Sequence, residues 1–267
     1  KEQEIFELMQ KAVALRNELI AKVSNPTEPH NKSLVRKYYA ALRADIVRSF
    51  EALFEELKQE QVDHVIAVPL TSGISSTAEM IQAAAHRAEM PLTLIDPYTT
   101  VNIQGYLALC AHQLAQQGVE PAEIERRLKA CVEHSNSLLV PDDLHHLKRG
   151  GRLTPLAATL GGLLKIKPIL QINEHTKGKI DVAGKVRTMS KAMDTVIERM
   201  KQAGVDRRYS VTVAHADAPE AAEVYRRKIE AAIEGVQVNV IKLVSVVGVH
   251  TGRGCQALQY FCPLSEE

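Results

Sequence analysis

The sequence predicts a two-domain α/β protein, in which a parallel α/β N-terminal domain is followed by a mixed α+β C-terminal domain. Two patterns support this prediction: short apolar strands alternate with helices in the first half, and their order becomes mixed beyond Asp142. A chain of 267 residues, 45 % of them hydrophobic, is also long enough to bury the cores of two moderate domains.

The chain opens with two helical stretches. Apolar residues recur at helical spacing from Ile5 to Val23 and again from Leu34 to Leu57, and the proline-bearing segment 24–29 separates the two runs. We assign residues 1–45 to N-terminal helices. Their apolar faces are expected to pack within the chain, although a dimer would also cover them.

The hydrophobic period then changes. Strands are expected at 62–70, 91–96 and 137–140, with helices at 78–88, 101–117 and 121–135. This alternation predicts a parallel sheet with helices on both faces, so residues 46–150 form the expected α/β domain.

The last part of the chain has a different order of elements. Asp142 is the expected N-cap of a short helix at 142–147. Further helices are expected at 156–164, 190–203 and 219–234, and strands at 167–173, 178–182, 209–215, 236–249 and 256–261. With a boundary between 140 and 154, residues 151–267 form the α+β domain.

Composition excludes several classes of partner and site. Lys plus Arg is 33 and Asp plus Glu is 32, and Trp is absent, so nothing favours nucleic-acid binding. We expect a cytoplasmic protein, because no apolar run is long enough to span a membrane and no signal peptide opens the sequence. The four cysteines form no C-x-x-C pair and are expected to be reduced and structural: Cys110, Cys131, Cys255 and Cys262.

A loop rich in hydroxyl groups follows the first predicted strand. Its sequence is Thr71-Ser72-Gly73-Ile74-Ser75-Ser76-Thr77, and a helix follows it. Free N–H groups at a helix N-terminus, serine and threonine hydroxyls and a glycine together suit an anion. The alternative is an ordinary helix cap. The loop lacks the G-x-S-x-G pattern, so a strained nucleophilic serine is not indicated.

A second candidate is His250, which follows the predicted strand 236–249 and precedes Thr251-Gly252-Arg253-Gly254. An imidazole there can donate a hydrogen bond to a carboxylate, or it can be a structural histidine. A metal site is not expected, because only His145 and His146 are paired and adjacent helix positions diverge.

Basic residues provide two further candidates. Lys148, Arg149 and Arg152 lie in a glycine-bearing turn that either binds phosphate or a partner or is simply solvated. Arg187 follows a predicted strand, where it either faces an anion or starts a helix at the surface.

Taken together, these segments resemble the DegV family of bacterial fatty-acid-binding proteins, over roughly residues 46 to 262. The motifs that carry the resemblance occur in the family's order: Pro69–Thr77, Asp142–Leu153, Leu164–Leu170, Lys185–Thr188 and Gly248–Gly254.

The resemblance implies a ligand tunnel between two domains and no catalytic residue. A long-chain fatty acid would be held by its carboxylate, and no other cofactor is expected. The implied contacts are Thr71, Ser72, Gly73, Ser75, Ser76, His250 and Thr251, with Arg187 near the ligand exit. The resemblance also implies a partner, a fatty-acid kinase that makes acyl-phosphate for phospholipid synthesis. Transient membrane contact is compatible with this role of an acyl carrier.

The sequence departs from the family pattern at four places. The family's opening Asp-Ser strand is missing, and Leu42–Asp45 stands where a Thr-Ser-x-Pro turn should lie. Ser76 replaces a glycine, and Arg253 often corresponds to a proline. Asp45 near a bound carboxylate would be unfavourable unless Arg43 or Arg187 compensates.

Two alternative functions remain open. The protein could be a small-molecule hydrolase or transferase that uses Ser72 or Ser75 with His250. It could also be a regulatory protein that docks a partner through its N-terminal helices and the basic turn.

Overall fold

The computed structural model describes residues 29–159 and 166–264, and only the backbone of residues 29–39. Its helices are α2 (Pro29–Gln59), α3 (Thr77–Arg87), α4 (Val101–Gln116), α5 (Pro121–Glu133), α6 (Leu144–Arg149), α7 (Pro155–Thr159), α8 (Met189–Gln202), α9 (Pro219–Ala232) and α10 (Ser245–Thr251). Its strands are β1 (Val65–Ala67), β2 (Leu92–Leu94), β3 (Ser135–Val140), β4 (Lys167–Ile172), β5 (Asp181–Val186), β6 (Ser210–His215), β7 (Val238–Lys242) and β8 (Gln256–Phe261). The helix predicted over residues 5–23 and the end of the one predicted at 156–164 lie outside the described residues.

The chain divides into two compact units. The described part of the first consists of residues 29–65 and 79–92, and that of the second of residues 66–78, 93–159 and 166–264. The division into 1–45, 46–150 and 151–267 stays a prediction.

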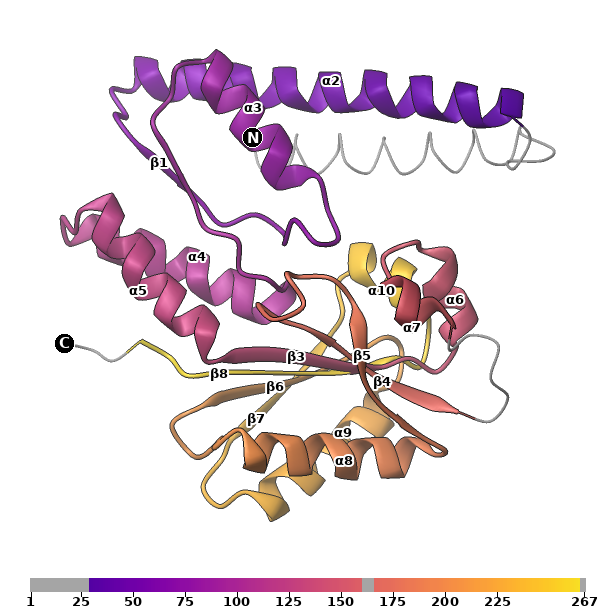
Figure 1. Ribbon diagram of the computed structural model, residues 1–267. Helices are drawn as coiled ribbons and strands as arrows, with labels where there is room; N and C mark the ends of the chain where they lie inside the picture. Colours follow the sequence, from indigo (N-terminus) through magenta and orange to yellow (C-terminus); the bar gives the residue numbers. More distant parts are fainter. Residues whose placement is uncertain (1–28, 160–165, 265–267) are drawn as a thin grey trace. The chain divides into compact units, whose positions relative to one another are not determined.

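The first unit is built on the long helix α2 and on α3 (Figure 1). Val47 and Phe54 of α2 and Ala84 of α3 are buried. The positions where the family pattern has a turn, Leu42–Asp45, lie inside α2, which runs through them without a break. Asp45 pairs with Arg48 of the same helix, so its charge is compensated within α2.

Strands β1 and β2 form a two-stranded sheet. The N–H of Val65 donates to the carbonyl of Pro91, and the N–H of Ile95 donates to the carbonyl of Ala67, both at 2.9 Å. Residue numbers therefore rise in the same direction along both strands. This is the parallel arrangement predicted for a strand–helix–strand segment. They are shorter and less buried than predicted, because each has only one neighbour in this sheet.

The second unit contains a six-stranded sheet in the order β5-β4-β3-β8-β6-β7. Only β6 and β7 pair in parallel, and the other neighbours are antiparallel. The prediction that 137–140 joins a parallel sheet with the first two strands is wrong. Strand β3 pairs with β4 and β8, opposing Leu139 to Leu170 and Leu138 to Leu258.

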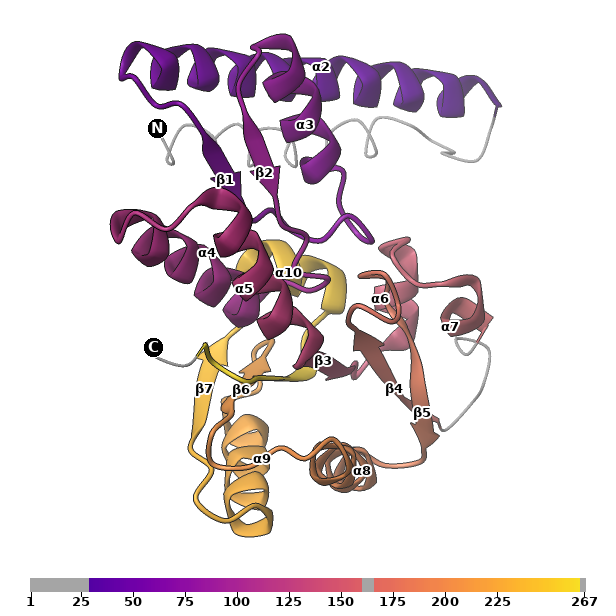
Figure 2. The same ribbon diagram turned by 60° about the vertical axis from the view of Figure 1, so that its left-hand side comes forward.

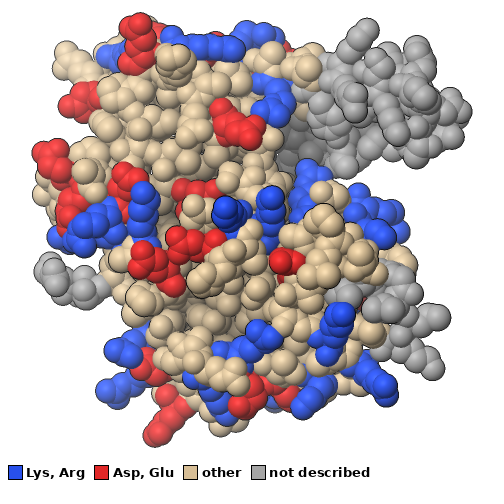
Figure 3. All heavy atoms as spheres, viewed as in Figure 1, with Lys and Arg blue, Asp and Glu red and all other residues tan. Residues whose placement is uncertain are grey.

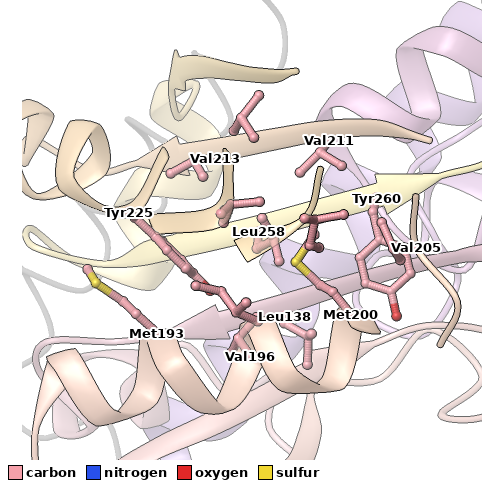
Figure 4. Packing of buried hydrophobic residues seen from close by; sticks show 14 of the residues in the cluster. Leu138, Met193, Val196, Met200, Val205, Val211, Val213, Tyr225, Leu258 and Tyr260 are labelled. Atoms are coloured by element: carbon pink, nitrogen blue, oxygen red, sulfur yellow. The ribbon is translucent and has the colours of Figure 1, made fainter. Parts of the chain in front are cut away.

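Helices cover both faces of this sheet (Figures 1 and 2). Leu138 of β3 belongs to the apolar cluster under α8 and α9, and Leu139 belongs to a cluster on the opposite face. Alternate residues of a strand point to opposite faces, so one strand supplies both cores. In Figure 4 Leu138 and Leu258 of the sheet lie against Val196 and Met200 of α8.

Two local predictions in the second unit are wrong. The expected strand 236–249 is β7 followed by α10, so His250 lies in a short helix and not at the end of a strand. The N-cap of α6 is Asp143, whose carboxylate accepts the N–H groups of His145 and His146, at 2.8 and 3.1 Å. These hydrogen bonds lower the pKa of Asp143.

The face of the molecule shown in Figure 3 has no dominant charge. On the face shown in Figure 3, Lys and Arg side chains lie among Asp and Glu side chains, in keeping with the near balance in the sequence. None of the described helices combines the length and the apolar character needed to cross a membrane.

Candidate functional site

The hydroxyl-rich loop Thr71–Thr77 lies in the second unit, whose first segment ends at Ala78. Thr71 is fully buried, and its N–H donates to the carbonyl of Thr99 at 3.3 Å. The carbonyl of Thr71 accepts the N–H groups of Ile74 and Ser75, so the loop closes into a compact turn. The turn is therefore held at its first residue and presents its hydroxyls from a fixed backbone.

Ser72 has both of its donors engaged by Asp96. The N–H of Ser72 donates to Oδ2 of Asp96 at 2.9 Å, and its hydroxyl donates to the same oxygen at 2.6 Å. The other carboxylate oxygen of Asp96 accepts the N–H of Tyr98 at 2.8 Å. In this arrangement Ser72 shapes the loop and offers no proton to a ligand.

Ser75 and Ser76 are differently placed. Oγ of Ser75 accepts the N–H of Thr77, the first residue of α3, at 3.2 Å, and it lies 2.8 Å from Oγ1 of Thr77. When Thr77 donates to Ser75, the Ser75 proton is available to a further acceptor. Ser76, half-buried beside them, adds a hydroxyl where the family pattern has glycine.

Two glycines let the loop touch the turn between β4 and β5. A Cβ on Gly73 would lie 2.2 Å from the carbonyl carbon of Gly178. Gly178 has φ +67°, and a Cβ there would lie 1.8 Å from Oγ1 of Thr71. Glycine is required at both positions by this close approach, and at Gly178 also by the left-handed backbone.

A buried polar network supports the loop from below. The side-chain nitrogen of Gln259 donates to the Ser137 hydroxyl and the Thr100 carbonyl, both at 2.8 Å, and to Thr99 Oγ1 at 3.3 Å. The side-chain oxygen of Gln259 accepts the N–H of Asn102 at 3.0 Å. Thr71, whose N–H donates to the carbonyl of Thr99, thus connects the loop to the centre of the six-stranded sheet.

Sequence reasoning missed Asp96 and Gln259. Asp96 follows the second strand directly, and the same logic that selected the loop after the first strand applies to it. Gln259 is a polar residue in an apolar strand, which is the signal of a buried hydrogen-bonded group.

The His250 turn is assembled by α10 and α6, which pack together. A Cβ on Gly150 would lie 3.2 Å from Nδ1 of His250, so the histidine ring lies on the glycine turn. Thr251 is only 6 % exposed, and its hydroxyl has no oxygen or nitrogen hydrogen-bond partner among the described residues. It interacts with the thiol of Cys255, four residues later, whose pKa burial raises to about 12 and the Thr251 hydroxyl lowers in part.

The loop and the His250 turn border the same apolar cluster. Ile74 of the loop, Leu147 of α6 and Val247 of α10 all pack into or against it. Sequence neighbours of both predicted groups of site residues thus pack at one apolar cluster of the second unit. Within residues 29–159 and 166–264, no three side chains suited to a metal ion gather.

The predicted basic residues lie outside this cluster. Lys148 and Arg149 are exposed at the end of α6, and Arg152 donates to the carbonyl of Gly150. Arg187 is exposed between β5 and α8, next to Thr188, the N-cap of α8. Arg253 forms a surface ion pair with Asp217.

Known proteins are similar to this chain in sequence and in fold. The family model described as "Uncharacterised protein, DegV family" matches residues 44–262. The DegV domain-containing protein spr1415 of Streptococcus pneumoniae is 35 % identical over 216 residues, which are 80 % of this chain and 76 % of that protein.

Two solved structures extend the comparison. The fatty acid binding DegV family protein SAG1342 from Streptococcus agalactiae has 29 % identity and a TM-score of 0.74, covering 80 % of this chain and 76 % of its own. DegV, a fatty acid binding protein from Bacillus subtilis, has 30 % identity and a TM-score of 0.69, with 81 % and 76 % covered. These matches confirm the predicted resemblance and the mixed α/β fold: the chain belongs to the DegV family.

Proposed function

We propose that this protein binds a long-chain fatty acid by its carboxylate and does not itself catalyse a reaction on it. The observation that carries the proposal is the buried hydroxyl of Thr251, which has no oxygen or nitrogen hydrogen-bond partner among the described residues and interacts only weakly, with the Cys255 thiol. A buried hydroxyl with only a weak partner is costly, and a ligand oxygen would satisfy it. The similar proteins from S. agalactiae and B. subtilis are described as fatty acid binding.

The physical chemistry of the ligand suits such a site. Each buried methylene of an acyl chain contributes about 0.8 kcal/mol, so burial of the chain against apolar side chains would supply most of the affinity. The carboxylate must be hydrogen-bonded once it leaves water. Hydroxyls of Ser75, Ser76 and Thr251, together with the His250 ring, are the donors we assign to it.

The remaining predicted contacts have other proposed roles. Thr71, Ser72 and Gly73 shape the loop, because their polar groups or their close packing are already committed within the second unit. Arg187 is exposed and is proposed to lie near the ligand exit.

We further propose that the bound carboxylate is presented to a fatty-acid kinase, which converts it to acyl-phosphate for phospholipid synthesis. The exposed Lys148 and Arg149, with Arg152, are the proposed partner surface. The protein would then act as an acyl carrier in the cytoplasm, with transient membrane contact as it exchanges ligand.

Native mass spectrometry after mild purification tests the proposal. We expect a fatty acid bound to the protein, or binding of added oleate or palmitate. A Ser75→Ala, Thr251→Val double variant should stay folded and lose most of this binding. Wild-type protein that carries no ligand and binds neither acid would overturn the proposal.

One observation favours the hydrolase or transferase alternative. Ser72 donates its hydroxyl to a carboxylate at 2.6 Å, and a neighbouring proton acceptor is what a nucleophilic serine requires. A fluorophosphonate probe would then label Ser72 covalently. Under the binding proposal no serine is labelled, which peptide mapping after incubation would establish.

A further inference from the structure

His146 of α6 reaches across to α10. Its Nε2 lies 2.7 Å from the carbonyl oxygen of Val249, one residue before His250. A Cβ on Gly252 would lie 3.0 Å from Cδ2 of the same ring, so the ring also packs against the turn that follows α10. One side chain thus contacts the backbone on both sides of His250 and Thr251.

The partners of His146 assign its tautomer. The guanidinium of Arg149 lies 3.3 Å from Nδ1, and arginine can only donate, so Nδ1 carries a lone pair. The carbonyl of Val249 can only accept, so Nε2 carries the proton. Both contacts require the same neutral imidazole.

Helix α10 depends on such a contact. Its sequence is Ser-Val-Val-Gly-Val-His-Thr, seven residues that include three β-branched valines and a glycine. Residues of these types are weak helix formers, and a helix this short is unstable without tertiary contacts. The carbonyl of Val249 lies in the last turn, where carbonyls have no partner inside the helix.

We propose that His146 is a positioning residue, which holds the last turn of α10 so that His250 and Thr251 face the carboxylate of the ligand. This inference rests on the proposed function for its role in binding. Its structural part, the hydrogen bond from Nε2–H to Val249, stands apart from any ligand.

Paired substitutions at adjacent histidines test the role. His146→Leu removes the hydrogen bond and should weaken oleate binding about tenfold, whereas His146→Gln keeps a donor at the Nε2 position and should restore affinity to within about threefold of wild type. The matched control is His145→Leu, since His145 is the exposed neighbour on the same helix. Oleate affinity of His145→Leu should equal that of wild type.

Two measurements without ligand keep the inference separate from the proposed function. In the wild type, ¹⁵N spectra of His146 should show a protonated Nε2 and an unprotonated Nδ1. Amide exchange at Gly252, whose N–H donates to Gly248 at 2.9 Å, should become faster in His146→Leu and stay unchanged in His145→Leu.

The outcomes are distinct. A wild-type protein that binds no fatty acid but shows this tautomer and this exchange pattern overturns the proposed function alone. A proton on Nδ1, or wild-type exchange and oleate affinity in His146→Leu, overturns the positioning role.

Discussion

Ser72 donates its backbone N–H and its hydroxyl to one oxygen of Asp96, at 2.9 and 2.6 Å. A carboxylate of the protein thereby occupies the two donors that the sequence assigned to a carboxylate of the ligand. Under the proposed function, the head group of the ligand is left to the other hydroxyls of the loop and to the His250 turn. Asp96 is the residue that decides how the loop is shaped.

Asp96→Ala should loosen the loop. Two hydrogen bonds to a charged group and the Tyr98 turn are lost, so we expect the free energy of unfolding to fall by about 1–3 kcal/mol and fatty-acid affinity to fall with it. Urea denaturation and oleate titration measure the two effects. Asp63→Ala, at an exposed position before β1, is the control. Equal stability of the two variants would contradict the role of Asp96.

Gln259→Met should destabilise the protein although it keeps the size of the side chain. The substitution leaves the buried Thr99 and Ser137 hydroxyls and the half-buried Asn102 N–H without their shared partner, at a cost of about 1–3 kcal/mol. Gln113→Met on the exposed face of α4 should have little effect on the urea midpoint. An unchanged midpoint for Gln259→Met would mean that the network does not support the loop.

Gly178→Ala and Gly118→Ala separate backbone strain from overlap. Both glycines have positive φ, +67° and +76°. An alanine at either position must adopt a left-handed backbone conformation, which lowers the free energy of unfolding by about 1 kcal/mol. Only at Gly178 would the new Cβ meet another atom, Oγ1 of Thr71 at 1.8 Å, whereas nothing lies within 4 Å at Gly118. We therefore expect Gly178→Ala to cost about 1–3 kcal/mol more and also to weaken ligand binding.

The Gly118→Ala variant serves as the baseline for both measurements, the free energy of unfolding and oleate affinity. If the two variants lose the same stability and bind equally well, the contact between the loop and the β4–β5 turn does not matter.

Glu123→Gln should reduce the acid sensitivity of the protein. Hydrogen bonds from Arg126 and Arg127 lower the pKa of Glu123 to about 2 from an ordinary value of 4.5. A lowered folded-state pKa adds stability above pH 4.5 that is lost as the pH falls towards 2. Thermal unfolding at pH 6 and pH 3 should show a smaller drop for Glu123→Gln than for wild type. The contribution to stability is small because Glu123 and its two arginine partners lie at the surface of α5.

Local pattern alone determined much of this protein. The strand–helix–strand segment, strand β4 and strand β8 are predicted because their periodicity and turn residues reflect local backbone preferences. The serine loop and the His250 motif are found in the same way, because the motifs of a family are short contiguous stretches of sequence. Their placement on one apolar cluster was beyond such reasoning.

Only the tertiary structure decided the remaining features. Strand β3 has a suitable local pattern, but its partners β4 and β8 come from distant parts of the chain, and no local signal identifies them. The valines before His250 favour a strand, yet they form α10, where packing on α6 and the hydrogen bond from His146 outweigh weak helix propensity. Likewise, Asp96 takes the donors of Ser72 because the fold brings residues 24 positions apart together. Propensity acts between neighbours in sequence, whereas the shape of this site is set by hydrogen bonds between neighbours in space.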